Sequence, residues 1–264
     1  MKDDLGNRMK EQYENRTRYF IPRRTFTIIR LDGKAFHTFT KGLDKPFDQD
    51  LIELMDSTMG FLCSEIQGAI FGYCQSDEIS ILLYDFEEEK TQAWFDGNIQ
   101  KIVSVSSSMA TNAFTNLMFH KVGEGKEKFL QNGDLKSIAF DSRVFTISDR
   151  IEVMNYFIWR QKDAIRNSIS MMAQALYSHR ELDGKSQADM KEMIAQKYEN
   201  WNQLPIGRQR GRGIFKKVIK DTTNVRGKIT PIFKKVWEYD EEIPVFEVKK
   251  GEYLDKIIPV INNI

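Results

Sequence analysis

Two apolar arms flank a short polar tip in the stretch AIFGYCQSDEISILLYDF, residues 69–86, and this pattern constrains the fold more than any other. The tip is Gln75-Ser76-Asp77, and the arms carry the β-branched and aromatic residues that strands favour. Two such arms joined by a tight turn form a β-hairpin, whose strands run antiparallel. The sequence therefore predicts an antiparallel sheet with acidic side chains at a hairpin tip.

Hydrophobic spacing predicts the other elements of the first half of the chain. The β-branched run TFTIIRL is a strand that Asp32-Gly33 ends as a turn, and apolar side chains at helical spacing fill 49–66. In chain order we expect a helix over 2–18, a strand over 25–31, a helix over 49–66, the hairpin, a helix over 91–117, a loop marked by Gly123, Gly125 and Gly133, and a strand over 140–147.

The second half begins with a long amphipathic pattern that predicts a helix from an N-cap at Ser148 to about Ser178. Its apolar stripe misses one step at Gln161–Lys162. Ser186 and Asp189 resemble a capping box for a short helix to about Lys197. Beyond that helix the chain is rich in Arg, Lys and Gly, and we expect mainly helical and irregular structure there.

These elements predict an α+β or α/β sheet domain over 1–148, followed by a helical, basic C-terminal portion over 149–264. The long helix can equally pack on the sheet, so the boundary near residue 148 stays open. With 264 residues, 41% of them hydrophobic, the chain can bury a substantial core as one large domain or two small ones.

Bulk properties exclude some classes of protein and leave others open. A net charge of +1 neither demands nor excludes a nucleic-acid partner, because the clustering of charges matters more than their sum. Cys63 and Cys74 lack CxxC spacing and are expected to be reduced thiols of a cytoplasmic protein. No run of about 18 apolar residues occurs, so we expect neither membrane insertion nor secretion.

The acids Asp32 and Asp77 form the sharpest candidate site. They stand 45 positions apart, and a sheet that lays the first strand beside the hairpin would bring them together. Two carboxylates at adjacent strand ends suit Mg²⁺, which prefers oxygen ligands and substrate phosphates. Two such ions about 3.5–4 Å apart can hold both the attacking and the leaving oxygen of a phosphoryl displacement. Gly33 lets the backbone approach closely. The alternative is that both acids are ordinary turn residues.

Cations suited to phosphate binding surround these acids in the sequence. Arg30, Lys34, Lys45 and Lys101 can each contact a triphosphate, and His37 can act as a polar partner of the turn. The stretch GRQRGRGIFKK, residues 207–217, forms a flexible basic segment with cations at Arg208, Arg210, Arg212, Lys216 and Lys217. The alternative for each of these residues is a solvated surface position.

Four blocks resemble the tRNA(His) guanylyltransferase-like family. IIRLDGKAFHTF is similar to its RxDGRxFHxF block, with Lys34 in place of the usual Arg, and GYCQSDEIS is similar to its YGQSDEYS block. FDSRVF and YFIWRQKDAIRNS are similar to its FDGRV and WRQxDxxxN blocks. The blocks occur in the family's order over about residues 1–215. The resemblance implies a palm-like fold, similar to that of 5′-to-3′ polymerases and nucleotide cyclases.

The resemblance also implies an activity and its partners. Members add nucleotides to the 5′ end of tRNA in the 3′-to-5′ direction, using two Mg²⁺ ions. ATP or GTP first activates the 5′-monophosphate, and the 3′-hydroxyl of an incoming nucleotide then attacks that end. Both steps place charge on phosphate oxygens, which metals and cations stabilise. A homotetramer is expected on the same basis.

Site residues follow from the matched blocks. Asp32, Gly33 and Asp77 would hold the metal ions, with Glu78 supporting them as a third catalytic residue. The nucleotide would contact Arg30, Gly33, Lys34, Ala35, Phe36, His37, Lys45, Asp48, Ser76, Asp77 and Lys101. RNA would contact Arg160, Asp163, Asn167, Arg208, Arg210 and Arg212.

One departure from the family narrows the function. Eukaryotic enzymes that add the extra G to tRNA(His) carry HINxLYN after WRQxDx, where this chain reads IRNSISM, with Ile165 for His and Met171 for the last Asn. The chain therefore resembles the bacterial and archaeal branch, which restores missing 5′ nucleotides by pairing against the acceptor strand. The alternatives are G addition to tRNA(His), a palm-type nucleotide cyclase, and a non-catalytic RNA-binding protein.

Overall fold

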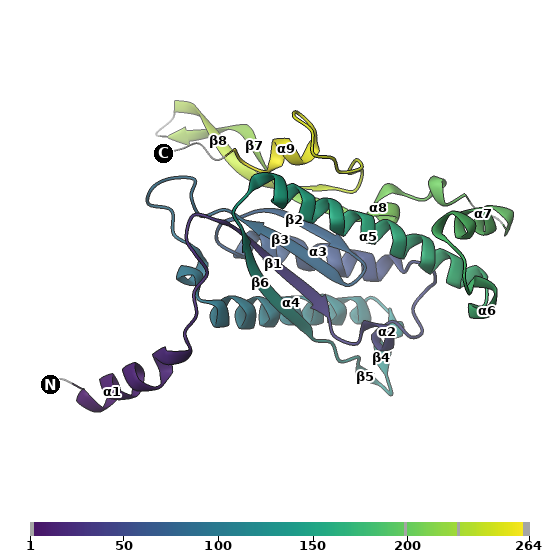
Figure 1. Cartoon of the computed structure of the whole chain (residues 1–264), viewed down its shortest axis with the longest axis horizontal. Coiled ribbons are helices and arrows are strands. Elements are labelled where there is room, and N and C mark those ends of the chain that lie inside the picture. The colour runs from purple at the N-terminus through teal and green to yellow at the C-terminus, as the bar shows by residue number, and fades with distance from the viewer. Residues whose placement is uncertain (1–2, 198–199, 226–227, 261–264) are drawn as a thin grey trace.

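A six-stranded antiparallel sheet forms the centre of the molecule (Figure 1), with strand order β6-β1-β3-β2-β7-β8. The structure is a computed structural model that describes residues 3–197, 200–225 and 228–260. The strands are β1 Phe26–Gly33, β2 Ala69–Gln75, β3 Glu78–Leu83, β6 Phe140–Ile147, β7 Arg212–Val225 and β8 Lys228–Asp240. The predicted mixed fold with an antiparallel sheet is confirmed.

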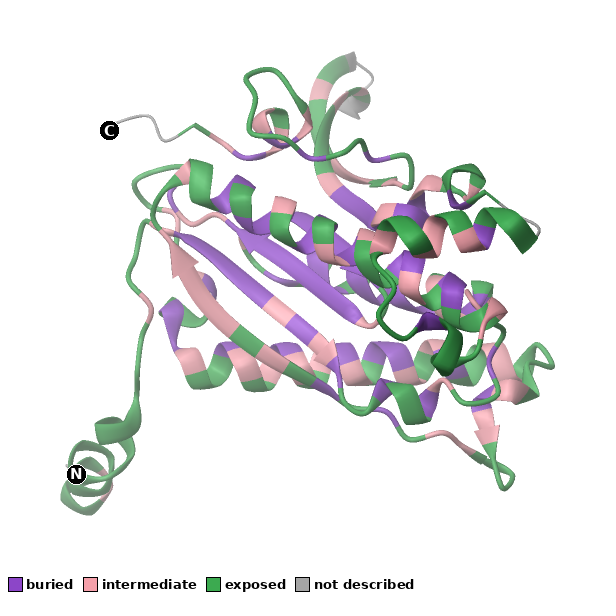
Figure 2. Cartoon of the chain, turned by 45° about the vertical axis from the view of Figure 1, so that its right-hand side comes forward, coloured by how far each residue is buried: buried purple, intermediate pink, exposed green. Residues whose placement is uncertain are grey.

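Helices cover both faces of the sheet, because the side chains of a strand alternate between faces. On β1, Ile29 belongs to the core under α3 (Gln49–Glu65) and α4 (Ile99–Gly123). Its neighbour Ile28 belongs to the core under α5 (Arg150–Leu176), to which α9 (Tyr253–Ile257) also contributes. Figure 2 shows the buried central strands between these layers. The long helix α5 therefore packs on the sheet, as one of the two expectations had it.

Most elements of the first half lie where the sequence places them. The expected strands over 25–31 and 140–147 are β1 and β6, the helix over 49–66 is α3, and the hairpin is β2–β3. The capping box at Ser186 and Asp189 is also present. The Asp189 amide donates to the Ser186 hydroxyl at 3.2 Å, the Ser186 amide donates to the Asp189 carboxylate at 2.9 Å, and α7 spans Gln187–Lys197.

Several helix boundaries differ from the expected ones. The helix expected over 91–117 begins only at Ile99, after a short 3₁₀ turn η2 (Trp94–Gly97), because the Asn98 side chain caps it. The N-cap of α5 is Asp149 and not Ser148, since the Asp149 carboxylate accepts the Glu152 amide at 3.0 Å. The N-terminal helix is split into α1 (Asp4–Gln12) and η1 (Glu14–Thr17).

The segment after α7 contains more strand than the sequence indicated. The short elements α6 (His179–Leu182), η4 (Trp201–Gln203) and α8 (Ile206–Arg210) fit the expected helical, basic portion. The strands β7 and β8, however, pair with each other and join β2, where irregular structure was expected. The stretch 207–217 is therefore helix and strand, not a flexible loop. Because these strands belong to the central sheet, the two expected portions share one sheet.

The gap in the apolar stripe of α5 is Gln161, a buried polar residue whose amide nitrogen and amide oxygen are both hydrogen-bonded. Gln161 is only 2% exposed. Its amide nitrogen donates to the carbonyl of Pro244 at 2.9 Å, and its amide oxygen accepts the amide of Phe246 at 2.7 Å. A buried amide that is bonded at both ends avoids the desolvation penalty of an unpaired one. Gln161 thus fastens the C-terminal segment to α5.

Two predictions about bulk character can be compared with the structure. Cys63 and Cys74 are free and buried, as expected for reduced thiols. Among the residues that the structure describes, no helix combines the length and the apolar character needed to cross a bilayer.

Candidate active site

The fold brings Asp32 and Asp77 together, as the sequence predicted. Strand β1 pairs with β3, so that Asp32 lies opposite Glu78, the residue that follows the hairpin turn. The amide of Gly33 donates to the carbonyl of Asp77 at 3.1 Å across this junction. Ser76, in the turn, has a φ of 50°, which turns the chain back within two residues. Two acids distant in sequence therefore stand at neighbouring strand ends.

The carboxylates of Asp32 and Asp77 lie close enough to repel each other. Burial and the nearby charge of Asp32 raise the pKa of Asp77 to about 6, which shows that Asp77 carries its charge at a disadvantage. In the described part of the chain, neither acid forms an ion pair, because the neighbouring arginines bind Glu78 instead. A divalent cation would remove the repulsion between the two carboxylates.

The donors present suit Mg²⁺ better than a metal enclosed by protein ligands. Among the described residues there is no group of three or more His, Cys, Asp or Glu side chains that could hold a metal. Two carboxylates and nearby backbone oxygens would leave coordination positions for water and substrate phosphates, which is how Mg²⁺ is usually bound. The residues therefore fit an ion that is held jointly with a nucleotide.

Glu78 has a structural place beside this pair, and it does not face the cavity. It is 3% exposed, and the guanidinium of Arg160 binds it with two hydrogen bonds of 2.7 Å. Arg30 adds an ion pair at 2.9 Å. Burial raises the pKa of Glu78, and the two arginines oppose that shift. Arg30 therefore pairs with Glu78 in the structure. The sequence analysis had predicted that it contacts the nucleotide.

The WRQ block lies around this buried ion pair. Arg160 also contacts Asp163 at 3.0 Å, and its guanidinium stacks on the ring of Trp159, 4.4 Å from the ring centre. Asp163 in turn pairs with Arg166 at 2.6 Å. Arg160 and Asp163 thus form an intramolecular network in this structure, and the sequence had placed both on RNA.

A cavity of about 710 Å³ opens beside the acids. Its walls come from the β1–α3 connection, the hairpin turn, the second half of α5 and the α8–β7 junction. The residues expected at the site that line it are Gly33, Ala35, Phe36, His37, Lys45, Asp48, Ser76, Asp77, Asn167, Arg208 and Arg212. Asp32, Arg30, Lys34, Glu78, Lys101, Arg160, Asp163 and Arg210 are not among the lining residues.

Lys45, Asp48 and Lys101, three of the expected nucleotide contacts, have different surroundings in the structure. Lys45 is exposed and lines the cavity, where it can reach a phosphate. Asp48 also lines it, but its carboxylate caps α3 at the Leu51 amide and pairs with Lys128 at 2.8 Å. Lys101 lies in the first turn of α4, where its amine sits over the ring of Phe95. Lys101 therefore does not join the cavity.

The three arginines of the 207–217 stretch that were predicted to contact RNA have different surroundings in the structure. Arg208 lines the cavity and hydrogen-bonds Gln49 at 3.0 Å. Arg210 donates to the backbone carbonyl of Ile243 at 2.9 Å. Arg212 is 6% exposed and pairs with Asp56 at 2.6 Å, so it is a structural residue here and presents no free cation to RNA.

Sequence reasoning missed the α5 wall of the cavity. Besides Asn167, that wall consists of Ala164, Ser168, Met171, Gln174 and Ala175. These positions recur every three or four residues, which places them on one face of the helix. The signal was present in the spacing, but small and polar residues in this stripe do not distinguish a cavity wall from a solvated face.

Comparison with known proteins decides the family. The family profile described as tRNAHis guanylyltransferase matches residues 6–148, which is more than half of the chain. The chain belongs to the tRNA(His) guanylyltransferase family. It is accordingly a nucleotidyltransferase.

Solved structures and curated relatives agree with this membership. A bacterial tRNA(His) guanylyltransferase-like protein in complex with ATP is 40% identical, with a TM-score of 0.81 over 97% of this chain and 100% of that one. A bacterial guanylyltransferase-like protein in complex with GTP is 41% identical, with a TM-score of 0.73 over 92% of this chain and 94% of the other. A probable tRNA(His) guanylyltransferase of Dictyostelium discoideum is 27% identical over 76% of this chain and 78% of its own length.

Proposed function

We propose that this enzyme adds nucleotides to the 5′ end of tRNA in the 3′-to-5′ direction, and that it repairs truncated 5′ ends against the acceptor strand as template. The observation that carries the proposal is the pair Asp32 and Asp77, which no cation of the described residues matches, beside a cavity large enough for a nucleotide. Family membership and the bacterial relatives in complex with ATP and GTP support the choice of ligand.

The chemistry follows from where charge develops. The 3′-hydroxyl oxygen of the incoming nucleotide bonds to the activated 5′ phosphorus and releases its proton to solvent, while the activating group leaves with the electron pair of the broken P–O bond. Mg²⁺ held by Asp32, Asp77 and the Gly33 backbone would supply charge neutralisation on the phosphate oxygens. Lys45, which also lines the cavity, binds a phosphate. The repulsion from Asp32 that helps to raise the pKa of Asp77 favours metal binding, because an ion in contact with both carboxylates relieves it.

Templated repair is favoured over G addition by what α5 presents at the two altered positions. Met171 lines the cavity, where it offers a thioether in place of an amide. Ile165 packs against the small core formed by α5, α7 and η4. Neither side chain can recognise a particular base by hydrogen bonds. Base pairing with the acceptor strand would then supply the choice of nucleotide, and the protein would bind RNA shape and backbone.

Substitution of Asp77 tests the metal site. With Mg²⁺, α-³²P-GTP and a tRNA that lacks its first nucleotide, we expect Asp77→Asn to lower addition by roughly 10³-fold or more, because a carboxylate ligand is lost. Affinity for tRNA should stay within about twofold, since the cationic contacts remain. The matched control is Asp134→Asn, because Asp134 is an exposed residue of β5 outside the cavity and away from β1 and the hairpin turn.

The outcome separates this function from its rivals. Near-normal turnover by Asp77→Asn would show that the assigned metal site is wrong. Cyclic or dinucleotide products without labelled RNA would favour a palm-type cyclase. Binding of tRNA without any transfer by the wild-type enzyme would favour a non-catalytic RNA-binding protein.

A pair of RNA substrates separates repair from G addition. One tRNA lacks its first nucleotide, and the other is a complete tRNA(His). We expect efficient addition to the first, and we expect the added nucleotide to change when the opposite base of the acceptor strand is changed. Addition of G whatever the opposite base would instead support G addition to tRNA(His).

Light scattering of the purified enzyme tests the proposed homotetramer.

A further inference from the structure

The wall of the cavity that carries Lys45 is supported from behind by a second segment. We call residues 36–52 the wall and residues 121–136 the strap. The strap contains the end of α4, the 3₁₀ turn η3 (Glu127–Phe129) and the small strands β4 (Leu130–Gln131) and β5 (Asp134–Leu135). The wall supplies many of the cavity-lining residues, and the strap supplies none. Any effect of the strap on a bound ligand must therefore pass through the wall.

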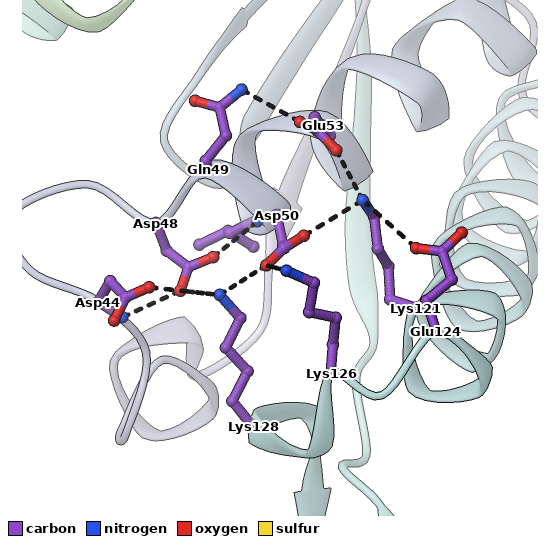
Figure 3. Close-up of polar contacts among 10 residues, drawn as sticks. Asp44, Asp48, Gln49, Asp50, Glu53, Lys121, Glu124, Lys126 and Lys128 are labelled. Carbon is purple, nitrogen blue, oxygen red and sulfur yellow. Dashed lines mark hydrogen bonds and ion pairs between the residues drawn. The ribbon is translucent and has the colours of Figure 1, made fainter.

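Lys128 makes the central contact between the two segments (Figure 3). Its amine lies 2.8 Å from the carboxylate of Asp48, 2.7 Å from that of Asp50 and 3.4 Å from that of Asp44. Asp48 in turn accepts the amides of Asp44 and Leu51, so one carboxylate fixes the loop and the start of α3 together. A single cation thus holds three acids of the wall.

Two further contacts fasten the strap to the first part of the wall. The amine of Lys136 donates to the backbone carbonyls of Phe39 and Lys41, at 3.2 and 2.8 Å. The ring of Phe129, which is fully buried, stacks on the ring of Phe39 at 6.4 Å. The wall is therefore held at both ends.

Charge gives Lys128 a role beyond packing. The wall places Asp44 and Asp48 on either side of Lys45 in the sequence, and all three line the cavity. In the described part of the chain Lys45 takes part in no ion pair, while Lys128 binds both of these acids. Without Lys128 the two acids would lose the cation that pairs with them, and Lys45 stands in the same loop, directly after Asp44 and three residues before Asp48. A lysine paired with a carboxylate of its own loop is less available to a phosphate.

We propose that Lys128 is a positioning residue for nucleotide binding, because it occupies Asp44 and Asp48 and so keeps Lys45 free for the nucleotide's phosphates. This inference rests on the proposed function only in that the cavity binds a nucleoside triphosphate. It assigns Lys128 no contact with the substrate.

Lys126 offers a matched control in the same cluster. Its amine makes one longer contact, at 3.5 Å, to Asp50 and none to Asp44 or Asp48. Replacement of either lysine by methionine removes one positive charge and leaves an unbranched side chain that is shorter by one atom. The two variants therefore change the charge of the strap equally. They differ in that only Lys128→Met leaves Asp44 and Asp48 without their cation.

The test measures the affinity of the purified, RNA-free enzyme for a non-hydrolysable GTP analogue with Mg²⁺, by isothermal titration calorimetry. We expect Lys128→Met to weaken binding about tenfold, and Lys126→Met and Lys128→Arg to stay within about threefold. In steady-state assays Lys128→Met should raise the KM for GTP and leave kcat and the KM for tRNA nearly unchanged. Replacement of Lys45 by methionine should make the two losses non-additive, because Lys128 acts through Lys45.

The possible results decide between positioning and plain stability. Equal effects of Lys126→Met and Lys128→Met, or additive losses in the Lys45→Met background, would overturn the proposal. If Lys128→Met does not fold, Lys128→Gln combined with Asp44→Asn removes the exposed competitor along with the lysine. That double variant should bind the analogue at least threefold more tightly than Lys128→Gln alone, and equal binding contradicts the proposal. Failure of the wild-type enzyme to bind the analogue would refute the proposed function and, with it, the role of Lys128.

Discussion

Asp50 shows how strongly single charges are constrained around the cavity wall. It lies in the first turn of α3 and contacts Lys121, Lys126 and Lys128. Burial acts to raise its pKa, but the hydrogen bonds from Lys128 and Lys121 outweigh burial and hold the pKa at about 2. Because this pKa is below that of the unfolded chain, ionised Asp50 stabilises the folded state.

The acid stability of the protein should reveal this residue. The contribution of Asp50 is complete above pH 4 and is lost as the pH falls from about 4 to about 2. We expect Asp50→Asn to lower the free energy of unfolding at pH 7 by about 1–2 kcal/mol and to flatten its decline over that window. Urea unfolding at a series of pH values measures both effects. Asp134→Asn, at an exposed position of β5, should change neither.

The buried ion pair of Glu78 leads to a second residue-level prediction. Arg160→Met leaves the carboxylate of Glu78 buried with only Arg30 beside it. Removal of one partner of a buried pair is strongly destabilising, so we expect a loss of about 3 kcal/mol in urea unfolding. Arg166→Met removes a more exposed arginine from the same helix and should lose less than about 1 kcal/mol. A similar loss for both variants would show that the pair is not essential.

At the scale of elements, the entry into β7 depends on a glycine. Gly211 has a φ of 85°, and a Cβ there would lie 2.5 Å from the hydroxyl of Tyr73 and 2.8 Å from the carbonyl of Cys74. Gly133 has a similar φ of 88°, but a Cβ there would meet no atom within 4 Å. Both substitutions by alanine carry the strain of a positive φ, and only one adds a collision.

We therefore expect Gly211→Ala to destabilise the fold by roughly 2 kcal/mol more than Gly133→Ala, because backbone and a buried ring cannot move away cheaply. Urea unfolding of the two variants gives the difference directly. Equal losses would mean that the β2–β7 junction can relax to accept a side chain.

The elements that the sequence predicted share a feature that β7 and β8 lack. In β1 and β3 the apolar side chains are buried on both faces, so each strand reads as a continuous apolar run. In β7, Lys216, Lys217 and Lys220 are exposed and interrupt the pattern. The strand nature of such a ribbon comes from its pairing with a distant segment, and a local pattern does not contain that information. The predicted starts of α4 and α5 were wrong for a similar reason, because the spacing of apolar residues does not show that the side chains of Asn98 and Asp149 bond the free amides of the first turn.

On the scale of the whole molecule, the C-terminal segment completes the second core. Ile243, Phe246, Leu254 and Ile258 are buried against α5 and the sheet. Arg150 at the start of α5 holds the segment by hydrogen bonds to Asp255 and to the carbonyls of Ile258 and Pro259. The sequence showed no motif here, because the segment matters through the surface that it covers.

A truncation after Asp240 should therefore disturb the whole fold. It uncovers apolar side chains of α5 and the sheet, and we expect strong binding of the dye ANS and a broad, less cooperative thermal transition. The full-length chain should show a sharp transition and weak dye binding in the same assays. A sharp transition and weak dye binding for the shorter chain would show that the second core is stable by itself.

The sequence motifs predicted the acidic residues of the site, but they did not predict which acids its arginines pair with in the folded chain. Asp32, Gly33 and Asp77 meet as the spacing and the family resemblance indicated. The sequence could not tell that Arg30 and Arg160 would be consumed by Glu78, or that Arg212 would be buried against Asp56. A motif shows that a residue is cationic, but only the structure shows which acidic residue it pairs with.

The two-residue turn between β2 and β3 also limits how this enzyme can change by insertion and deletion. One residue added within 75–78 would shift β3 against β1 and turn every side chain of the strand to the opposite face, removing Asp77 from Asp32. The connection from Tyr84 to Ala93 begins at the other end of β3, so a change in its length does not shift β3 against β1. Length variation between natural or engineered versions of this protein should therefore gather in that connection, and the hairpin turn should keep a constant length.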